Sequence, residues 1–221
     1  MIAEIYYYTS CEADVKENGL KVGEEVDLVV PVKGKLLHSL SLEDNILFHV
    51  LTTPNSIVEP IDNNTISIKN VYIQSFQALS PSVIENIIEI DKEDVYARHG
   101  FILDWAIEHC FRSVIIFYLS KYPTLRKYID RLIYDNLTKT DRTWTLIQII
   151  KRYEYDVHKN NDALFKQAAM CKNIKMCEIL LNEKGCLIPA NIFKIYKTHG
   201  SKHYPLMWEF LKENADKVDW R

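Results

Sequence analysis

The stretch that decides the fold is a set of three windows that align without a gap: 106-AIEHCFRSVIIFYL-119, 137-LTKTDRTWTLIQII-150 and 168-AAMCKNIKMCEILL-181. The windows have equal lengths, and each begins 31 positions after the one before it. Each starts with an apolar residue, crosses a short polar turn and ends in an apolar cluster. Apolar residues spaced three or four apart form one face of a helix, so each window predicts the middle of a helical hairpin. A further apolar residue lies four positions before each window, at Ile102, Ile133 and Leu164.

A fourth, weaker copy follows the third. Ile192–Tyr196 is its predicted first helix and Leu206–Leu211 its second, with polar residues toward the end of the sequence. In repeat proteins each unit buries its apolar face against its neighbours, and the terminal unit is atypical because one of its faces meets water. Residues 94–221 are therefore predicted to form an all-α stack of helical hairpins.

The third copy, Asp162–Gly185, resembles an ankyrin repeat. In that family a Leu precedes a pair of small residues, a turn leads to an apolar position, and a Leu-Leu pair is followed by Gly. The small pair lets two helices approach closely, and the Gly accepts the positive φ that ends a helix. The matching residues are Leu164, Ala168, Ala169, Asn173, Ile174, Leu180, Leu181 and Gly185.

The other copies depart from the ankyrin pattern. The Thr-Pro-Leu-His start of the family is missing from every copy, and the period of 31 is shorter than the usual period of about 33. With its β-rich leader and its Ile-, Asn-, Lys- and Tyr-rich composition, the whole chain resembles the ankyrin-type proteins abundant in large DNA viruses of amoebae. That resemblance implies a host-interaction role, in the host cytoplasm or in the virion.

Residues 1–80 are predicted to form a small α+β module, because short runs rich in β-branched and aromatic residues favour strands. Asn63-Asn64 is a predicted turn. Ser41 followed by Asp44 resembles a helix cap, so one short helix is predicted from residue 41 to 51. The predicted strands are Ala3–Thr9, Glu25–Pro31, Lys35–Leu40, Ser56–Ile61 and Thr65–Phe76.

Ser80-Pro81 is a helix start, with a capping hydroxyl and a proline at the first helical position. Residues 81–93 are therefore predicted to be a linking helix between the module at 1–80 and the helical repeats at 94–221. The complete fold is predicted to be α+β.

Composition restricts the partners of the chain. Of its 221 residues 48% are hydrophobic, which is enough for a buried core, and the net charge is −3. This charge gives no general attraction to nucleic acid, and no stretch is long and apolar enough to span a membrane. Five cysteines, an odd number, favour free thiols in a reducing compartment. The sequence therefore predicts an intracellular protein that is not secreted.

Two groups of residues carry side chains suited to chemistry. His199 and His203 lie four apart, and Cys171 and Cys177 precede them, but these residues lack the spacing of a closed zinc site. The adjacent residues His109 and Cys110 point in different directions on a helix, so Cys110 is predicted to be a buried structural cysteine. No catalytic, metal-binding or cofactor-binding residue and no cofactor is predicted.

The four tryptophans of the sequence could either stack on bases or ligands or pack in the core. Trp105, Trp144 and Trp208 lie in apolar helical clusters, so these three are predicted to be buried.

The predicted contact surface follows from the repeat, because first helices line the concave side of an ankyrin-like stack. Equivalent polar positions on these helices, and positions four residues further along the same face, are predicted to contact a protein partner. They are Asp104, Asp135, Lys166, Glu108, Lys139 and Met170.

The favoured hypothesis is a non-enzymatic protein-protein interaction module. The alternative is an enzyme or effector with its site in the N-terminal module, where His38, Glu43 and His49 are candidate polar groups, and with the repeats as a targeting arm. A third interpretation is a homo-oligomer that packs through the terminal hairpin around Trp208.

Overall fold

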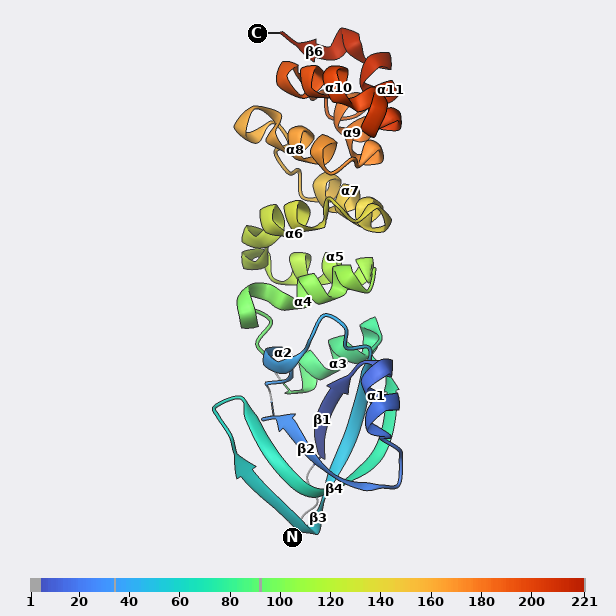
Figure 1. Cartoon of the computed structure of the whole chain (residues 1–221). Helices are drawn as coiled ribbons and strands as arrows, with labels where there is room; N and C mark the ends of the chain where they lie inside the picture. The colour runs from blue at the N-terminus through green and yellow to red at the C-terminus, as the bar shows by residue number, and fades with distance from the viewer. Residues whose placement is uncertain (1–4, 34, 92, 221) are drawn as a thin grey trace. The chain divides into compact units, whose positions relative to one another are not determined.

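The computed structural model describes residues 5–33, 35–91 and 93–220 (Figure 1). Its contacts divide the chain into an N-terminal unit, residues 1–125, and a C-terminal unit, residues 126–221. The fold is mixed α+β, as predicted. The sequence places the boundary between the N-terminal module and the helical repeats at residues 81–93, before the division at residue 125. That boundary stays a prediction.

A four-stranded antiparallel sheet forms the centre of the N-terminal unit (Figure 1). Its order is β1 (Ile5–Ser10), β3 (Ile46–Pro60), β4 (Thr65–Ala78) and β2 (Glu25–Pro31). The predicted strand Glu25–Pro31 is confirmed with the same bounds, and Thr65–Phe76 lies within β4. The core that the sheet buries comprises Leu28, Val30, Phe48, Val50, Ile66, Ile68, Val71 and Ile73.

The alternation along β4 changes phase at Asn70. Ile66 and Ile68 are buried before it, and Val71 and Ile73 are buried after it. Asn70 adopts φ 56°, and its backbone N–H donates to the Asp27 carboxylate at 2.9 Å. An extra residue in a strand is a bulge that redirects the following side chains, which a simple alternating pattern does not predict.

The turn between β3 and β4 is confirmed at its predicted position. Asp62 Oδ1 accepts the backbone N–H groups of Asn64 and Thr65 at 2.7 and 2.8 Å. A side-chain carboxylate that bonds the backbone two and three residues on is a common way to close a tight turn.

The predicted helix at residues 41–51 is wrong, because Ile46–Leu51 belongs to β3. Asp44 does bond the backbone N–H of Ser41, but it also accepts the hydroxyl of Thr9 at the end of β1, which closes a turn. Pairing of β3 with β1 and β4 buries Phe48 in the sheet core. Strand pairing over a long sequence separation therefore overrides the local helical spacing.

The predicted strand at Lys35–Leu40 is also wrong, because these residues contain the one-turn helix α2 (Leu36–Ser39). The buried carboxylate of Glu93 accepts the backbone N–H groups of Leu36 and Leu37 at 2.8 and 3.1 Å. A carboxylate satisfies the otherwise unpaired donors of a helix start. This partner lies far away in the sequence, so no local pattern shows it.

The helix predicted to start at Pro81 is confirmed as α3 (Pro81–Asp91), and its linking role stays a prediction. Trp105 is fully buried on α4, and its indole N–H donates to the Asp44 carbonyl at 2.8 Å, which fixes α4 to the loop before β3. Besides α2 and α3, the helices of the N-terminal unit are α1 (Glu12–Asn18), α4 (Ala97–Glu108) and α5 (Arg112–Lys121).

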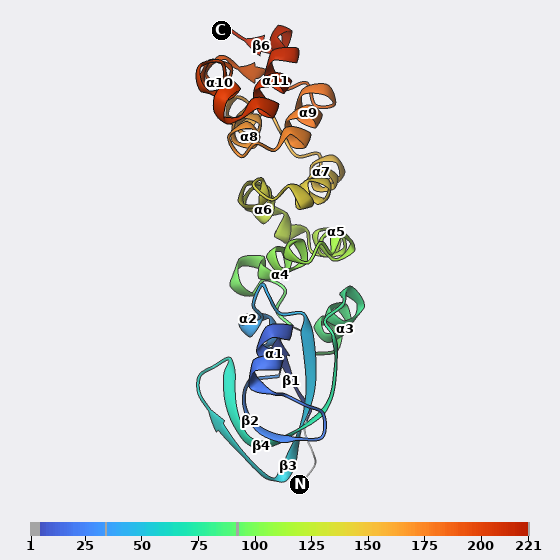
Figure 2. The same cartoon turned by 45° about the vertical axis from the view of Figure 1, so that its right-hand side comes forward.

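The C-terminal unit is built from helices in pairs, and a short parallel pair of strands, β5 (Ile188–Pro189) and β6 (Val218–Asp219), lies beside the last pair. Helices α8 and α9 contact each other, as do α10 and α11 (Figure 2). The helices of this unit are α6 (Ile129–Asn136), α7 (Thr143–Arg152), α8 (Lys159–Met170), α9 (Ile174–Asn182), α10 (Ala190–His203) and α11 (Pro205–Glu213). Short 3-10 helices span Pro123–Tyr128, Thr140–Arg142 and Ala215–Lys217.

The repeating apolar positions are buried as predicted. Ile102, Ile133 and Leu164 are each at most 1% exposed. Gly185 has φ 69°, which confirms the positive φ expected after the second helix of the third copy. The three helical hairpins predicted from the constant spacing are therefore present as the pairs α4/α5, α6/α7 and α8/α9, and the weaker fourth copy is present as α10/α11.

The first and third hairpins share a backbone detail. Residues 98–100 before the body of α4 and residues 160–162 before the body of α8 all have positive φ. In each case the turn follows an Asp whose carboxylate accepts a backbone N–H two residues on: Asp94 with Tyr96 at 2.9 Å, and Asp156 with His158 at 3.0 Å. Tyr96 and His158 are equivalent positions, separated by two periods of the repeat. The first and third hairpins thus begin with the same turn.

Candidate functional site

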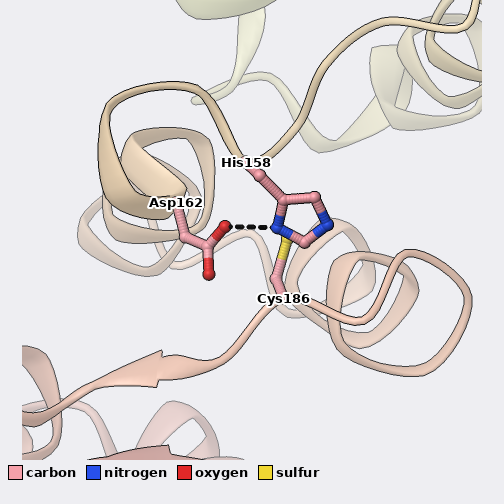
Figure 3. A group of neighbouring side chains, drawn as sticks. All are labelled: His158, Asp162 and Cys186. Carbon is pink, nitrogen blue, oxygen red and sulfur yellow. Dashed lines mark hydrogen bonds and ion pairs between the residues drawn. The ribbon is translucent and has the colours of Figure 1, made fainter. Parts of the chain in front are cut away.

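Three side chains of types that bind metals converge at the start of α8 (Figure 3). His158 immediately precedes the helix, Asp162 lies in its first turns, and Cys186 comes from the loop between α9 and β5. One ligand atom from each lies within 4.8 Å of the other two, and this is the one such group of three or more His, Cys, Asp or Glu found among the described residues. We call it the His-Asp-Cys cluster.

The backbone at Asn160, Asn161 and Asp162 sets the position of the carboxylate. All three residues have φ 55°, a left-handed conformation that Asn and Asp tolerate better than other side chains. The first hairpin has the same turn at residues 98–100, so the turn belongs to the scaffold. What differs between the two hairpins is the chemistry of the side chains attached to it.

Each polar atom of His158 and Asp162 has a defined neighbour. His158 Nε2 lies 3.0 Å from the Lys184 carbonyl oxygen, and Asp162 Oδ2 accepts the Leu187 backbone N–H at 3.0 Å. A carbonyl only accepts, so Nε2 carries a proton. In a neutral ring the other nitrogen, Nδ1, then presents a lone pair to Asp162 Oδ1 at 2.8 Å. Two acceptors at this distance require a cation between them, either a proton or a metal ion.

Cys186 completes the cluster as a buried thiol. It is 1% exposed, and burial, aided by the negative charge of Asp162 and a hydrogen bond to it, raises its pKa to about 12. Reactive thiols have a lowered pKa and access to solvent. The protonated Cys186 is therefore a poor nucleophile, and the cluster does not resemble an activated cysteine dyad.

An open cleft of about 900 Å³ lies beside the cluster. It contains both charge signs, with Asp162, Asp219, Lys166 and Lys194 in its lining. His158 and Asp162 belong to that lining, so the cleft gives solvent and small molecules access to them.

A second hollow, of about 230 Å³, lies between the end of α8 and α10, and we call it the α8–α10 hollow. Its two most exposed apolar side chains are Met170, 62% exposed, and Ile195, 53% exposed. Its lining includes one lysine, Lys172, and no acidic residue among those described. The Lys172 ammonium lies 4.1 Å from the centre of the Tyr204 ring, which borders this hollow and a neighbouring one that contains Leu206.

The predicted partner-binding residues lie in both units. Lys166 lines the cleft beside the His-Asp-Cys cluster, and Met170 lines the α8–α10 hollow. Asp135 and Lys139 are exposed on and just after α6, whereas Asp104 and Glu108 are partly buried on α4 in the N-terminal unit. One interface formed by all six residues stays a prediction, and the structure groups Lys166 with Met170 on one helix.

Two predictions of burial are wrong. Cys110 is exposed, because it occupies the turn between α4 and α5 with φ 56°. Trp144 is 60% exposed at the start of α7, because Leu146, Ile147 and Ile150 form the buried face of that helix and position 144 lies opposite.

The structure also places two other tryptophans and the two histidines considered as zinc ligands. Trp105 is buried, and Trp208 is half-buried with its ring 5.5 Å from Phe193. His199 and His203 are exposed on α10, which continues as a helix through both, and neither belongs to the His-Asp-Cys cluster.

The candidate polar groups of the N-terminal module lie outside the small hollow described there. The hollow found there encloses only about 10 Å³ and is lined by none of His38, Glu43 and His49. His49 instead contacts the Gln77 side chain at 3.0 Å on the sheet. Apolar side chains fill the core behind the sheet, so the structure gives the alternative of an N-terminal active site no support.

Sequence reasoning missed the His-Asp-Cys cluster. The spacing of four between His158 and Asp162 is a weak signal, and Cys186 follows only after the whole of α9, with no Cys-x2-Cys motif. A stronger signal is the pair of segments Asp94-Val95-Tyr96 and Asp156-Val157-His158. They are separated by two periods of the repeat and differ at the residue that becomes a candidate ligand.

The chain matches no protein-family model, no curated protein and no solved structure in comparisons with each. Within the described part of the chain, every helix is too short or too polar to cross a membrane.

Proposed function

We propose that this protein is a non-enzymatic protein-binding module whose contact surface is the α8–α10 hollow. The observation that supports the proposal is the exposure of two apolar side chains, Met170 and Ile195, at a concave site. Burying a Met or Ile side chain contributes about 1.5–3 kcal/mol, so a partner that covers both residues gains substantial affinity.

The charges around the hollow define the chemistry of the partner. Lys172 borders the hollow, and the described lining of the hollow contains no acidic residue. The neighbouring cleft contains both charge signs, so the positive charge of the hollow itself comes from Lys172. The occupant proposed is therefore a segment of a protein in which a bulky apolar side chain is flanked by acidic residues. Complementary charges speed association and exclude partners of the opposite sign.

The resemblance of the third copy to an ankyrin repeat supports the same function. Met170 and Lys166 lie on α8, the first helix of that copy, which in an ankyrin-like stack belongs to the binding side. A host-interaction role in an infected cell, implied by the resemblance to viral ankyrin-type proteins, is part of this proposal.

The test is selection of peptides from a random display library on the immobilised full chain. We expect enrichment of sequences that combine one large apolar residue with nearby Asp or Glu. Met170→Glu and Ile195→Glu should each weaken the binding of a selected peptide by about 30-fold, which corresponds to losing about 2 kcal/mol of apolar burial.

Trp144→Glu is the matched control, since it also places a charge at an exposed apolar residue, but on α7 and outside the hollow. Equal losses for Trp144→Glu and Met170→Glu, or enrichment of basic peptides, would contradict the proposal. Light scattering of the purified chain tests the homo-oligomer interpretation, and a dimer abolished by Ile195→Glu would assign the hollow to self-association instead.

A further inference from the structure

We propose that His158, Asp162 and Cys186 bind a divalent transition metal ion, Zn²⁺ in the cell, with the fourth coordination position open to the adjacent cleft. The ligand atoms are His158 Nδ1, a carboxylate oxygen of Asp162 and Cys186 Sγ. This inference concerns a different site from the α8–α10 hollow and does not depend on the proposed function.

The donor set favours zinc over the common hard cations. Mg²⁺ and Ca²⁺ prefer oxygen ligands, whereas Zn²⁺ accepts imidazole, thiolate and carboxylate together in a four-coordinate site. Zinc sites with three protein ligands keep a water or another ligand in the fourth position. The cleft of about 900 Å³, which His158 and Asp162 line, provides the space for that ligand.

The distances between the three side chains suit a metal ion after a small adjustment. Bond lengths of about 2.0–2.3 Å in a tetrahedral site place ligand atoms about 3.3–3.6 Å from one another. The ligand atoms here lie within 4.8 Å of one another, and Nδ1 and Oδ1 are 2.8 Å apart. A rotation of the side chains that separates Nδ1 from Oδ1 by about half an ångström opens the tetrahedral position.

The surrounding hydrogen bonds already orient two of the ligands as metal ligands are usually held. His158 Nε2–H bonds the Lys184 carbonyl, which directs the lone pair of Nδ1 into the cluster. The Leu187 backbone N–H bonds Asp162 Oδ2, which leaves Oδ1 toward His158. A backbone carbonyl that accepts from the far nitrogen of a ligating histidine is typical of metal centres.

The first hairpin is an internal comparison that separates the scaffold from the ligands. Two periods before the three ligands, the sequence has Tyr96, Gly100 and Thr124. The Thr124 hydroxyl donates to the Tyr96 hydroxyl at 2.7 Å, so the same two segments are joined there without a metal ligand. The scaffold therefore does not need His, Asp and Cys, and the third hairpin has three side chains that bind metals where the first has Tyr, Gly and Thr.

Metal binding has a defined proton balance. The ion forms bonds to Nδ1, Oδ1 and Sγ, and two protons are released to solvent: the one shared by His158 Nδ1 and Asp162 Oδ1 and the one on the Cys186 thiol. The ion joins the start of α8 to the loop before β5, so it stabilises the folded state in proportion to its affinity.

The experiment uses the full chain, stripped with a chelator and titrated with Co²⁺ as a spectroscopic substitute for Zn²⁺. We expect saturation at one ion per chain, a near-ultraviolet band from thiolate-to-cobalt charge transfer and intense visible bands of a four-coordinate ion. Added Zn²⁺ should displace Co²⁺ and raise the thermal unfolding midpoint.

Two variants test the ligands. Asp162→Asn keeps a residue that tolerates the left-handed turn, and the double variant His158→Tyr with Cys186→Thr copies the hydrogen-bonded pair of the first hairpin. Removing the hydrogen-bond partner of a metal ligand costs about 10–100-fold in metal affinity. Both variants remove a ligand itself, so each should bind Co²⁺ more weakly by a larger factor than this. The double variant should also lose the charge-transfer band. Cys110→Ser, at an exposed cysteine outside the cluster, is the matched control and should behave as the parent chain.

Several results would overturn the inference. If the parent chain binds no Co²⁺ saturably while its circular dichroism shows that it is folded, His158 and Asp162 share only a proton. A charge-transfer band that persists in the double variant but disappears in Cys110→Ser would place the metal on other thiols. Circular dichroism of each metal-free variant shows whether it is folded, and a folded double variant with unchanged affinity would also refute the assignment.

Discussion

The side chain of Asn173 joins three segments of the C-terminal unit. Its Nδ2 donates to the Leu137 carbonyl and to the Thr143 hydroxyl, both at 2.9 Å, and its Oδ1 accepts the Met176 backbone N–H at 3.1 Å. Asn173 is fully buried, so these bonds satisfy groups that water does not reach. At the residue scale, this one amide both caps α9 and connects it to the preceding hairpin.

Replacing Asn173 with Ala should lower the free energy of unfolding by about 2–4 kcal/mol, because a helix cap is lost and buried polar groups lose their partner. Chemical denaturation followed by circular dichroism measures the change. Gln167→Ala, an exposed amide on α8, is the control and should change stability by less than about 0.5 kcal/mol. Similar losses in the two variants would refute the structural role of Asn173.

The left-handed turn at residues 160–162 provides a second prediction at this scale. Asn161 is exposed and has φ 55°, so its contribution is mainly conformational. Asn161→Val should destabilise the chain by about 1–2 kcal/mol, since a β-branched residue is strained there. Asn161→Gly should leave stability within about 0.5 kcal/mol of the parent, because glycine adopts this conformation freely. Thermal unfolding of the two variants provides the comparison, and equal midpoints would show that the turn is not left-handed.

At the scale of elements, a polar contact joins α6 to the segment before α8 and to the first residue of α8. The Asp130 carboxylate accepts the Tyr155 hydroxyl and pairs with the Lys159 ammonium at 2.7 Å. The hydrogen bond from Lys159, followed by that from Tyr155, holds the pKa of Asp130 below its usual value. Asp130 therefore favours the folded state most when it is ionised.

This contact predicts a pH dependence. A carboxyl group with a depressed folded pKa stabilises the protein above its unfolded pKa of about 4, and the contribution is lost as the pH falls through the lower folded value. The Asp130 side chain is 47% exposed, so solvent screening limits the effect to less than about 1 kcal/mol. Asp130→Asn should be less stable than the parent at pH 7, and the difference should shrink below about pH 4. Denaturation curves at several pH values measure it, and a difference that grew toward acid would contradict the assignment.

At the scale of the whole molecule, the contacts group α4 and α5 with the β-sheet, although their sequence pattern groups them with the repeats. Trp105 explains the grouping, since its bond to the Asp44 carbonyl fixes α4 within the N-terminal unit. Two units with separate cores are expected to unfold as separate cooperative transitions.

Calorimetry of the full chain tests this division. Trp105→Phe should lower the midpoint of one transition, because it leaves the Asp44 carbonyl without its donor and costs about 1–3 kcal/mol. Leu180 is a buried residue of α9, and Leu180→Ala should lower the midpoint of the other transition, because it costs about 2–5 kcal/mol of stability. If both variants shifted the same single transition, the two units would form one cooperative structure.

The sequence by itself determined the helical hairpins, their constant spacing and most of the strands. Apolar periodicity is a local property, and the positions it marks, such as Ile102, Ile133 and Leu164, are buried in each of the first three copies. The left-handed turn at Asn160-Asn161-Asp162 was not predicted, although these residue types tolerate positive φ.

Only the tertiary structure decided the features that depend on distant partners. The Glu93 carboxylate makes residues 36–39 a helix, and pairing with β1 and β4 makes residues 46–51 a strand. In the same way Cys186 reaches His158 and Asp162 only because the α8/α9 hairpin folds back on itself. A period in the sequence determines which face of a helix is buried, whereas the meeting of three side chains requires the path of the chain in space.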